Sequence, residues 1–124
     1  MASEKKILFV DDEDDIREVL QIRLESYGYQ VMTAGSGEEA LQKVQTDHPD
    51  LIILDIMMPG MDGLAVLKKL RKDESTSDLP VIMLTAKRKK LIGDLFEFEN
   101  IQGFIEKPFE SEVLLDLIKK ALRE

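Results

Sequence analysis

Short apolar runs alternate with longer amphipathic stretches along the whole chain, and this alternation constrains the fold more than any other feature. Three runs, at residues 7–10, 51–54 and 81–84, are continuously apolar. Runs of this kind are typical of strands that are buried on both faces. Two mixed runs, at residues 29–34 and 103–106, are typical of strands at the edge of a sheet. We therefore expect five strands.

Helical periodicity fills the segments between these runs. Five stretches carry apolar residues at the three- and four-residue spacing of a helix face. They are Ile16, Val19, Leu20 and Leu24; Ala40, Leu41 and Val44; Leu64, Leu67 and Leu70; Leu91, Ile92, Leu95 and Phe98; and Val113, Leu114, Leu117, Ile118 and Leu122. Five strands alternating with five helices are typical of a parallel sheet with right-handed crossovers, so we predict a doubly wound α/β fold.

Three helix ends have local signals. Gly28 stands where a helix C-terminus needs a left-handed residue. Ser36 and Glu39 have the spacing of a capping box, in which each residue satisfies a backbone N–H near the other. Asp62 is expected to cap the third helix through its side-chain oxygen.

Length and charge narrow the function classes. The 124 residues suit one compact domain, and we expect residues 1–124 to form it. The 25 acidic residues exceed the 17 basic ones and give a net charge of −8, so we expect no direct nucleic-acid binding. Because the sequence has no cysteine, no long apolar run and no signal-peptide pattern, we expect a cytoplasmic protein that does not interact with membranes.

Polar side chains follow four of the apolar runs. In an open parallel sheet, ligands bind beyond the carboxyl ends of the strands, so the residues that end each run are the candidate site residues. They are Asp11 and Asp12 after the first strand, Asp55 after the third, Thr85 at the end of the fourth and Lys107 after the fifth. Each has an ordinary structural explanation alone, as a cap, a turn or a surface residue. Their convergence on one edge is what indicates a site.

Three carboxylates at one edge need an opposite charge. At an effective dielectric constant near 20, each close pair repels by about 4 kcal/mol. Lys107 and a divalent cation would offset that repulsion. Mg²⁺, or Mn²⁺ in its place, suits a site of carboxylates and phosphate oxygens, whereas zinc is disfavoured because there is no cysteine and His48, the only histidine, is expected in a surface loop. This combination of groups is suited to phosphoryl transfer.

The sequence resembles the receiver domains of bacterial two-component response regulators. Four motifs carry the resemblance, in the family's order and at its spacings, over nearly the whole chain from about Lys6 onward. They are Val10-Asp11-Asp12-Glu13, Leu54-Asp55-Ile56-Met57-Met58-Pro59-Gly60-Met61-Asp62-Gly63, Thr85-Ala86 and Lys107-Pro108-Phe109. The resemblance implies a flavodoxin-like sheet of five parallel strands in the order 2-1-3-4-5, with five helices.

The resemblance also implies a role for each matching residue. Asp55 matches the phosphoacceptor, which attacks a phosphohistidine. Asp11 and Asp12 match the acidic pair that holds Mg²⁺ together with Asp55 and the backbone carbonyl of Met57. Lys107 matches the lysine that neutralises phosphoryl oxygens, and the bond before Pro108 is often cis in this family. The switch residues are Thr85, whose hydroxyl moves toward the phosphoryl group, and Phe104, whose rotamer follows it. Ile16 matches a kinase-docking position, although it is equally compatible with a role in the core.

The implied partners are a sensor histidine kinase or a histidine phosphotransfer protein, and a downstream protein target. A phosphorylation-dependent dimer is a further expectation. The chain is expected to act as a phosphoacceptor signalling domain that catalyses only its own phosphorylation and dephosphorylation. It either acts alone or is the receiver part of a multidomain transcriptional regulator or a hybrid kinase. The unusual segment around Lys87–Lys90, Phe96 and Phe98 leaves the partner that reads the switch open.

Three other interpretations remain at this stage. A haloacid-dehalogenase-type phosphatase would also use an aspartyl phosphate, but it needs a second Asp two residues after the nucleophile, where this chain has Met57. A flavodoxin-like binding module needs a phosphate loop rich in Thr, Ser and Gly, where this chain has five consecutive acids at residues 11–15. A degenerate receiver signals without phosphorylation and would not need the site residues. This chain keeps the acidic pair, Asp55, Thr85 and Lys107, which argues against that interpretation.

Overall fold

The computed structural model describes residues 5–85 and 101–124, which form five strands and four helices. In chain order the elements are β1 (Lys6–Val10), α1 (Asp14–Ser26), β2 (Gln30–Ala34), α2 (Gly37–Asp47), β3 (Leu51–Asp55), α3 (Gly63–Lys72), β4 (Val81–Thr85), β5 (Gly103–Glu106) and α5 (Ser111–Leu122). The helix expected around Leu91 to Phe98 lies outside the described residues.

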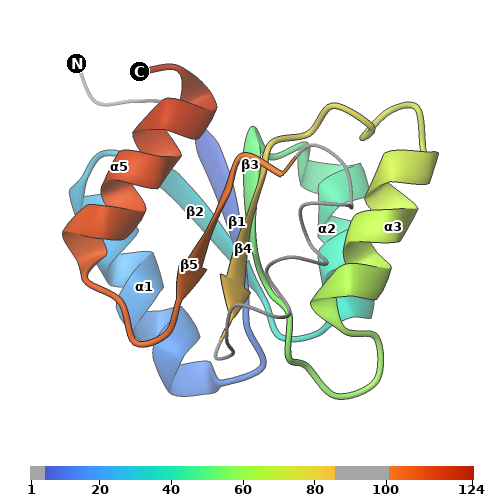
Figure 1. The fold of residues 1–124 in the computed structure, drawn as a ribbon, viewed down its shortest axis with the longest axis horizontal. Coiled ribbons are helices and arrows are strands. Elements are labelled where there is room, and N and C mark those ends of the chain that lie inside the picture. Colours follow the sequence, from blue (N-terminus) through green and yellow to red (C-terminus); the bar gives the residue numbers. More distant parts are fainter. Residues whose placement is uncertain (1–4, 86–100) are drawn as a thin grey trace.

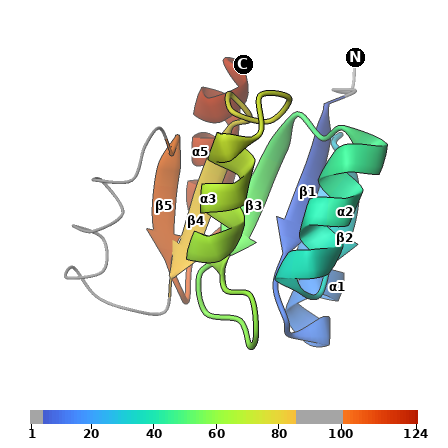
Figure 2. The ribbon, with the colours of Figure 1, turned by 90° about the vertical axis from the view of Figure 1, so that its right-hand side faces the viewer.

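All five strands are parallel and lie in the order β2-β1-β3-β4-β5, as the resemblance implied. Figure 1 shows α1 and α5 on one face of this sheet and α2 and α3 on the other. Figure 2, turned by 90°, shows the strands pointing the same way, with β5 at one edge. The two mixed runs are the edge strands β2 and β5, and the three continuously apolar runs are the central strands.

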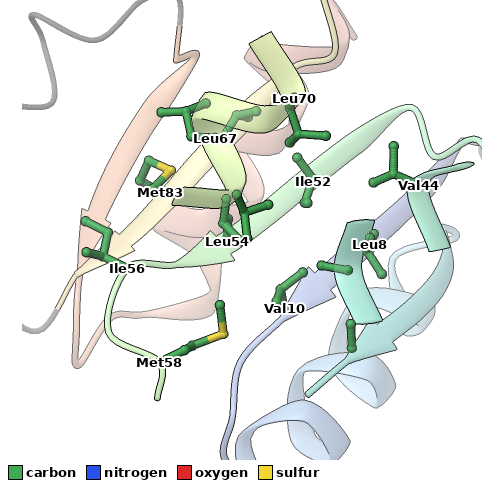
Figure 3. Packing of buried hydrophobic residues seen from close by; sticks show 14 residues of the cluster. Leu8, Val10, Val44, Ile52, Leu54, Ile56, Met58, Leu67, Leu70 and Met83 are labelled. Carbon is green, nitrogen blue, oxygen red and sulfur yellow. The ribbon is translucent and has the colours of Figure 1, made fainter. Parts of the chain in front are cut away.

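Alternate residues of the central strands feed two separate hydrophobic clusters. Leu8, Ile52, Leu54 and Met83 belong to the cluster under α2 and α3, which Figure 3 shows at close range. Their sequence neighbours, such as Phe9 and Ile53, belong to the cluster under α1 and α5. Because successive strand side chains point to opposite faces, a run that is apolar throughout is what a sheet covered on both sides requires.

The helix faces differ from the sequence expectation at two positions. Val19 and Val113 have helical spacing, yet they are 55% and 48% exposed. In α1 the fully covered residues are Leu20 and Leu24, and in α5 they are Leu114 and Ile118. A helix that covers only part of a sheet buries a narrow stripe, so apolar residues at the margin of the periodic pattern stay in water.

The predicted helix ends are close to those observed. Gly28 has a φ of 98° and follows Tyr27, the C-terminal cap of α1. Ser36 accepts a hydrogen bond from the Glu39 N–H at 3.1 Å, but Glu39 reaches back to the N–H of Gly35 at 2.8 Å rather than to that of Ser36. The first bond of the capping box therefore forms as predicted. In the second bond the Glu39 carboxylate binds the N–H of Gly35, one residue before Ser36, because that N–H lies within its reach.

The only histidine of the sequence lies at the end of α2. His48 is exposed, as expected, and it ends α2 in the left-handed conformation with a φ of 50°.

No helix among residues 5–85 and 101–124 is both long and apolar enough to cross a membrane.

Side-chain capping predicts that the N-terminal cap residues of α3 and α5 contribute differently to stability. Asp62 Oδ1 accepts a hydrogen bond from Ala65 N–H at 2.9 Å at the start of α3, whereas Glu110 at the start of α5 makes no side-chain cap bond. We expect Asp62→Ala to lower the free energy of unfolding by about 1 kcal/mol and Glu110→Ala to leave it nearly unchanged. Urea denaturation followed by circular dichroism measures both, and equal losses in the two variants would contradict the capping role.

Candidate phosphoacceptor site

The candidate site lies at the carboxyl ends of the central strands. Asp11 follows β1 directly, Asp55 ends β3, and Thr85 ends β4. Lys107 follows β5, the edge strand next to β4. Because the strands are parallel, their carboxyl ends meet at the same edge of the sheet, the edge to which the strand arrows point in Figure 1. The fold therefore brings together residues that are up to 96 positions apart in the sequence.

A lysine ammonium bridges two buried carboxylates at this edge. Lys107 Nζ lies 2.6 Å from Asp11 Oδ2 and 3.0 Å from Asp55 Oδ2. The side chain of Asp11 is fully buried and that of Asp55 is 4% exposed, while the lysine side chain is 17% exposed. Charge-assisted hydrogen bonds of this length are stronger than those between neutral groups, particularly when they are shielded from water.

Burial and ion pairing affect the pKa values of Lys107 and Asp55 differently. Burial by itself would lower the pKa of Lys107, but its hydrogen bonds and ion pairs with Asp11 and Asp55 outweigh that effect and raise the pKa above its usual value. Burial raises the pKa of Asp55, and the bond from Lys107 only partly opposes this. The difference has a simple cause: the lysine has two anionic partners, whereas Asp55 has one cation and also faces the charge of Asp11.

Asp12 completes a cluster of three carboxylates. One oxygen from each of Asp11, Asp12 and Asp55 lies within 4.8 Å of the others, and Asp12 is the exposed member. Among residues 5–85 and 101–124, the three carboxylates of this cluster and Lys107 together carry a formal net charge of −2. Hard oxygen donors with this charge are typical of a Mg²⁺ site, and the exposed side of the cluster leaves room for waters or a phosphate oxygen.

Backbone amides hold the two buried carboxylates in place. Asp11 Oδ1 accepts a bond from the Glu13 N–H at 2.9 Å, and Asp55 Oδ1 accepts one from the Met57 N–H at 3.0 Å. In each case one oxygen binds the following turn while the other binds Lys107. Both carboxylates are therefore fixed in orientation by groups that come from different strands.

The other predicted residues differ in burial and in what they pack against. Thr85 is fully buried, and its carbonyl accepts a bond from the Lys107 N–H at 2.7 Å. Phe104 is half-buried against the cluster under α2 and α3. Met57 is 51% exposed beside Asp55. Ile16 is half-buried against the cluster under α1 and α5, so part of its side chain packs inward. The Lys107–Pro108 bond is cis.

Arg17 was not predicted from the sequence, although it restrains the acidic turn. Its Nη1 donates to the carbonyl oxygen of Asp11 at 2.6 Å, and its Nη2 pairs with Asp14. The pairing of Asp14 with Arg17 three residues later is a common pattern on helix surfaces, and that spacing was the available signal. The contact with the Asp11 carbonyl depends on the path of the turn, which the spacing does not reveal.

Comparison with known proteins identifies the family. The family model described as "Response regulator receiver domain" matches residues 7–119. The chain belongs to the response regulator receiver domain family. This assignment excludes the phosphatase and the flavodoxin-like binding module as descriptions of the chain. Receiver domains are phosphoacceptor modules of two-component signalling rather than classical enzymes.

Several relatives of this receiver domain are known. Over 126 residues it is 43% identical to the alkaline phosphatase synthesis transcriptional regulatory protein PhoP of Bacillus subtilis, covering 96% of this chain and 49% of PhoP. The chain spans about half the length of the curated relatives it matches, which are transcriptional regulators.

Solved structures agree with the fold. A putative response regulator from Chloroflexus aurantiacus superposes with a TM-score of 0.90 at 36% identity, covering 98% of this chain and 100% of that one. The response regulator TrrA from Thermotoga maritima, in complex with Mg(2+)-BeF, has a TM-score of 0.84 at 42% identity and covers 95% of this chain and 99% of that one.

The raised pKa of Asp55 predicts that its charge costs stability. A carboxyl group whose pKa is raised by folding adds stability below its unfolded pKa and loses that contribution as the pH rises through the folded pKa. At pH 7 the ionised Asp55 therefore lowers the free energy of unfolding. We expect Asp55→Asn, which keeps the shape but not the charge, to raise the urea midpoint at pH 7 in the presence of EDTA.

The matched control for this prediction is Asp116→Asn, which removes an exposed carboxylate from α5. Its midpoint should stay close to that of the wild type, because an exposed charge is well solvated. A lower midpoint for Asp55→Asn than for the wild type would show that the ion pair with Lys107 outweighs burial and repulsion.

Proposed function

We propose that Asp55 is the phosphoacceptor of this receiver domain and that Asp11, Asp12, Thr85 and Lys107 assist the transfer. The observation that carries the proposal is the pocket in which Lys107 bridges Asp11 and Asp55 while a net charge of −2 remains. A pocket that is short of positive charge and open on one side suits a cation and a phosphoryl group together.

The chemistry follows from the positions of the two Asp55 oxygens. One carboxylate oxygen attacks the phosphorus of a phosphohistidine; the new P–O bond forms as the P–N bond breaks, and the imidazole nitrogen keeps the electron pair. Lys107 lies 3.0 Å from Asp55 Oδ2 and so is placed to neutralise phosphoryl oxygens. The Met57 N–H holds Asp55 Oδ1 and limits rotation of the carboxylate.

Mg²⁺ is the expected cofactor, with Mn²⁺ as a substitute. Asp11, Asp12, Asp55 and the backbone carbonyl of Met57 would hold it, and the charge and oxygen donors of the pocket fit such an ion. When bound, the ion supplies charge neutralisation for the transferring phosphoryl group. The complex of TrrA with Mg(2+)-BeF supports the same assignment here, given the 42% identity between the chains.

The proposed switch runs through Thr85 and Phe104. Phosphorylation adds negative charge and acceptor oxygens, which can take hydrogen bonds from the Thr85 hydroxyl and Lys107. Two bonds to a charged group supply roughly 3–6 kcal/mol, and about 5.5 kcal/mol shifts a two-state equilibrium from 1:99 to 99:1. The two hydrogen bonds therefore supply about as much free energy as the switch between the two states requires. Phe104 pairs with Met83 across β4 and β5, and Met83 lies two positions before Thr85 in β4. This register supports Phe104 as the residue whose rotamer would follow a movement of Thr85.

The wider setting is also a proposal. We place residues 1–124 in one receiver domain whose partners are a sensor histidine kinase or phosphotransfer protein and a downstream protein target. Because the matched relatives are about twice as long and are transcriptional regulators, the domain suits the receiver part of such a regulator, with a hybrid kinase as the other arrangement. Direct nucleic-acid or membrane binding by this domain is not expected, a phosphorylation-dependent dimer is compatible with it, and the expected location is the cytoplasm.

Acetyl phosphate tests the phosphoacceptor. With acetyl phosphate and Mg²⁺, we expect one acid-stable, base-labile phosphate on Asp55, mapped by peptide mass spectrometry. The modification should be lost in Asp55→Asn and without Mg²⁺, whereas Asp78→Asn, a change at an exposed aspartate outside the pocket, should retain it. Modification of a different residue in the wild type would refute the assignment.

Ile16 tests the proposed docking of the kinase. It lies in the first turn of α1, four residues after Asp12 in the sequence, and is half-buried. We expect Ile16→Ala to slow phosphotransfer from a histidine kinase while phosphorylation by acetyl phosphate keeps its wild-type rate, because only the protein donor needs this surface. Stopped-flow or gel-based phosphotransfer assays measure both rates.

Leu122→Ala is the matched control for Ile16→Ala. Leu122 is also half-buried against the cluster under α1 and α5, but it lies at the end of α5 remote from the pocket. Its phosphotransfer rates should match those of the wild type. Equal slowing of Ile16→Ala with both donors would show that Ile16 serves the fold rather than kinase docking.

A further inference from the structure

The loop of residues 56–62 connects the phosphoacceptor to α3 and is held at both ends by close backbone packing. It starts directly after Asp55 and contains Met57, whose carbonyl is a proposed metal ligand. A hydrogen bond of 3.0 Å from the Gly63 N–H to the Ile56 carbonyl closes it. The position of this loop therefore decides where the Met57 carbonyl lies relative to Asp11 and Asp12, and where the Met57 N–H holds the Asp55 carboxylate.

Gly63 holds one end of the loop. A Cβ atom added to this residue would overlap the Asp55 carbonyl oxygen and lie 2.8 Å from the Ile56 Cα. Both are backbone atoms, which cannot move aside as the end of a flexible side chain can. The first turn of α3 thus packs directly against the peptide group of the proposed phosphoacceptor, at a distance that only glycine permits.

Gly37 holds the other end, from an element distant in the sequence. It is the first residue of α2 and is buried. An added Cβ would lie 2.7 Å from the Met61 carbonyl oxygen, 2.9 Å from Val66 Cγ2 and 3.0 Å from Met61 Cβ. The start of α2 is therefore in contact with the same loop that α3 closes.

Close approach, rather than backbone conformation, accounts for glycine at both positions. Neither residue has a φ in the left-handed region, where glycine is favoured; Gly28 and Gly60 do. Both residues are the first of their helices, where the cost of glycine in a helix interior does not apply. The close contacts are therefore what glycine permits at these two positions.

The start of α2 is too well anchored to absorb an added methyl group. The Ser36 side chain caps the Glu39 N–H at 3.1 Å, the Ser36 carbonyl accepts from the Ala40 N–H at 3.0 Å, and Glu39 binds the Gly35 N–H at 2.8 Å. Ala40, one turn further along, is fully buried. The loop, with its exposed residues Met57, Pro59 and Gly60, is the part that must move.

We propose that Gly37 and Gly63 are positioning residues that hold the loop of residues 56–62 from both sides and thereby set the geometry of the metal and phosphoacceptor pocket. The proposal rests on the proposed metal site but extends it to α2, which contributes no group to the pocket. A change at the start of α2 then alters Mg²⁺ affinity without touching a ligand.

Gly37→Ala is the main test, with Mg²⁺ alone as the probe. We expect its dissociation constant for Mg²⁺, measured by isothermal titration calorimetry, to rise by about tenfold, the lower end of the range for groups that orient metal ligands. With ¹³C-methyl methionine labelling, the NMR signals of Met57, Met58 and Met61 should shift, because these residues belong to the loop of residues 56–62. A purely structural role would lower stability and leave Mg²⁺ affinity unchanged.

Gly103→Ala is the control, because Gly103 begins β5, at the opposite end of that strand from Lys107. Its added Cβ would meet Leu117 Cδ2 at 3.1 Å, the end of a flexible side chain that can yield. We expect wild-type Mg²⁺ affinity for it. Gly63→Ala should weaken binding more than Gly37→Ala, but it is more prone to misfolding because its clashes are all with backbone, so the milder variant decides the test.

The outcomes separate the two proposals. A wild-type protein that binds no Mg²⁺ refutes the proposed metal site. A wild-type protein that binds Mg²⁺, together with Gly37→Ala that binds it equally well or Gly103→Ala that is equally impaired, refutes the positioning role and leaves the metal site intact. Loss of affinity confined to Gly37→Ala and Gly63→Ala supports it.

Discussion

The contact of one ammonium group with two buried carboxylates is the interaction on which the site depends. Lys107 makes it possible to keep Asp11 and Asp55 almost fully out of water, and each carboxylate is also fixed by a backbone N–H. Buried charges are costly unless they are paired, and here the pairing is incomplete, because three carboxylates share one lysine. That residual negative charge is typical of a site for a divalent cation.

Such an imbalance needs a rigid frame, and the doubly wound sheet supplies one. The central strands are buried on both faces, so their carboxyl ends cannot shift without disturbing both hydrophobic clusters. The loop after Asp55 is held by close backbone contacts with two helices, and the turn after Asp11 is held by Arg17. Residues that never contact a phosphoryl group thus determine the distances between those that would.

Much of the fold was predictable, for identifiable reasons. Continuous apolar runs predicted the central strands because period-two alternation disappears when both faces are covered, and the strand-end rule then grouped Asp11, Asp55, Thr85 and Lys107. The sequence pattern failed at the margins: Val19 and Val113 fit the helical spacing but lie in water, and Glu39 binds the Gly35 N–H rather than that of Ser36. Periodicity gives the direction of a side chain around its helix, but not where the covering neighbour ends.

The sequence by itself determined the order and type of the elements and which residue types end the strands, because these depend on local spacing along the chain. Only the tertiary structure decided that Lys107 bridges Asp11 and Asp55, that Arg17 reaches the Asp11 carbonyl, and that Gly37 and Gly63 press against one loop. These contacts join elements whose separation is set by helix and sheet packing to within a few tenths of an ångström. No local pattern encodes a distance of that kind, because it results from all the side chains that fill the space between the elements.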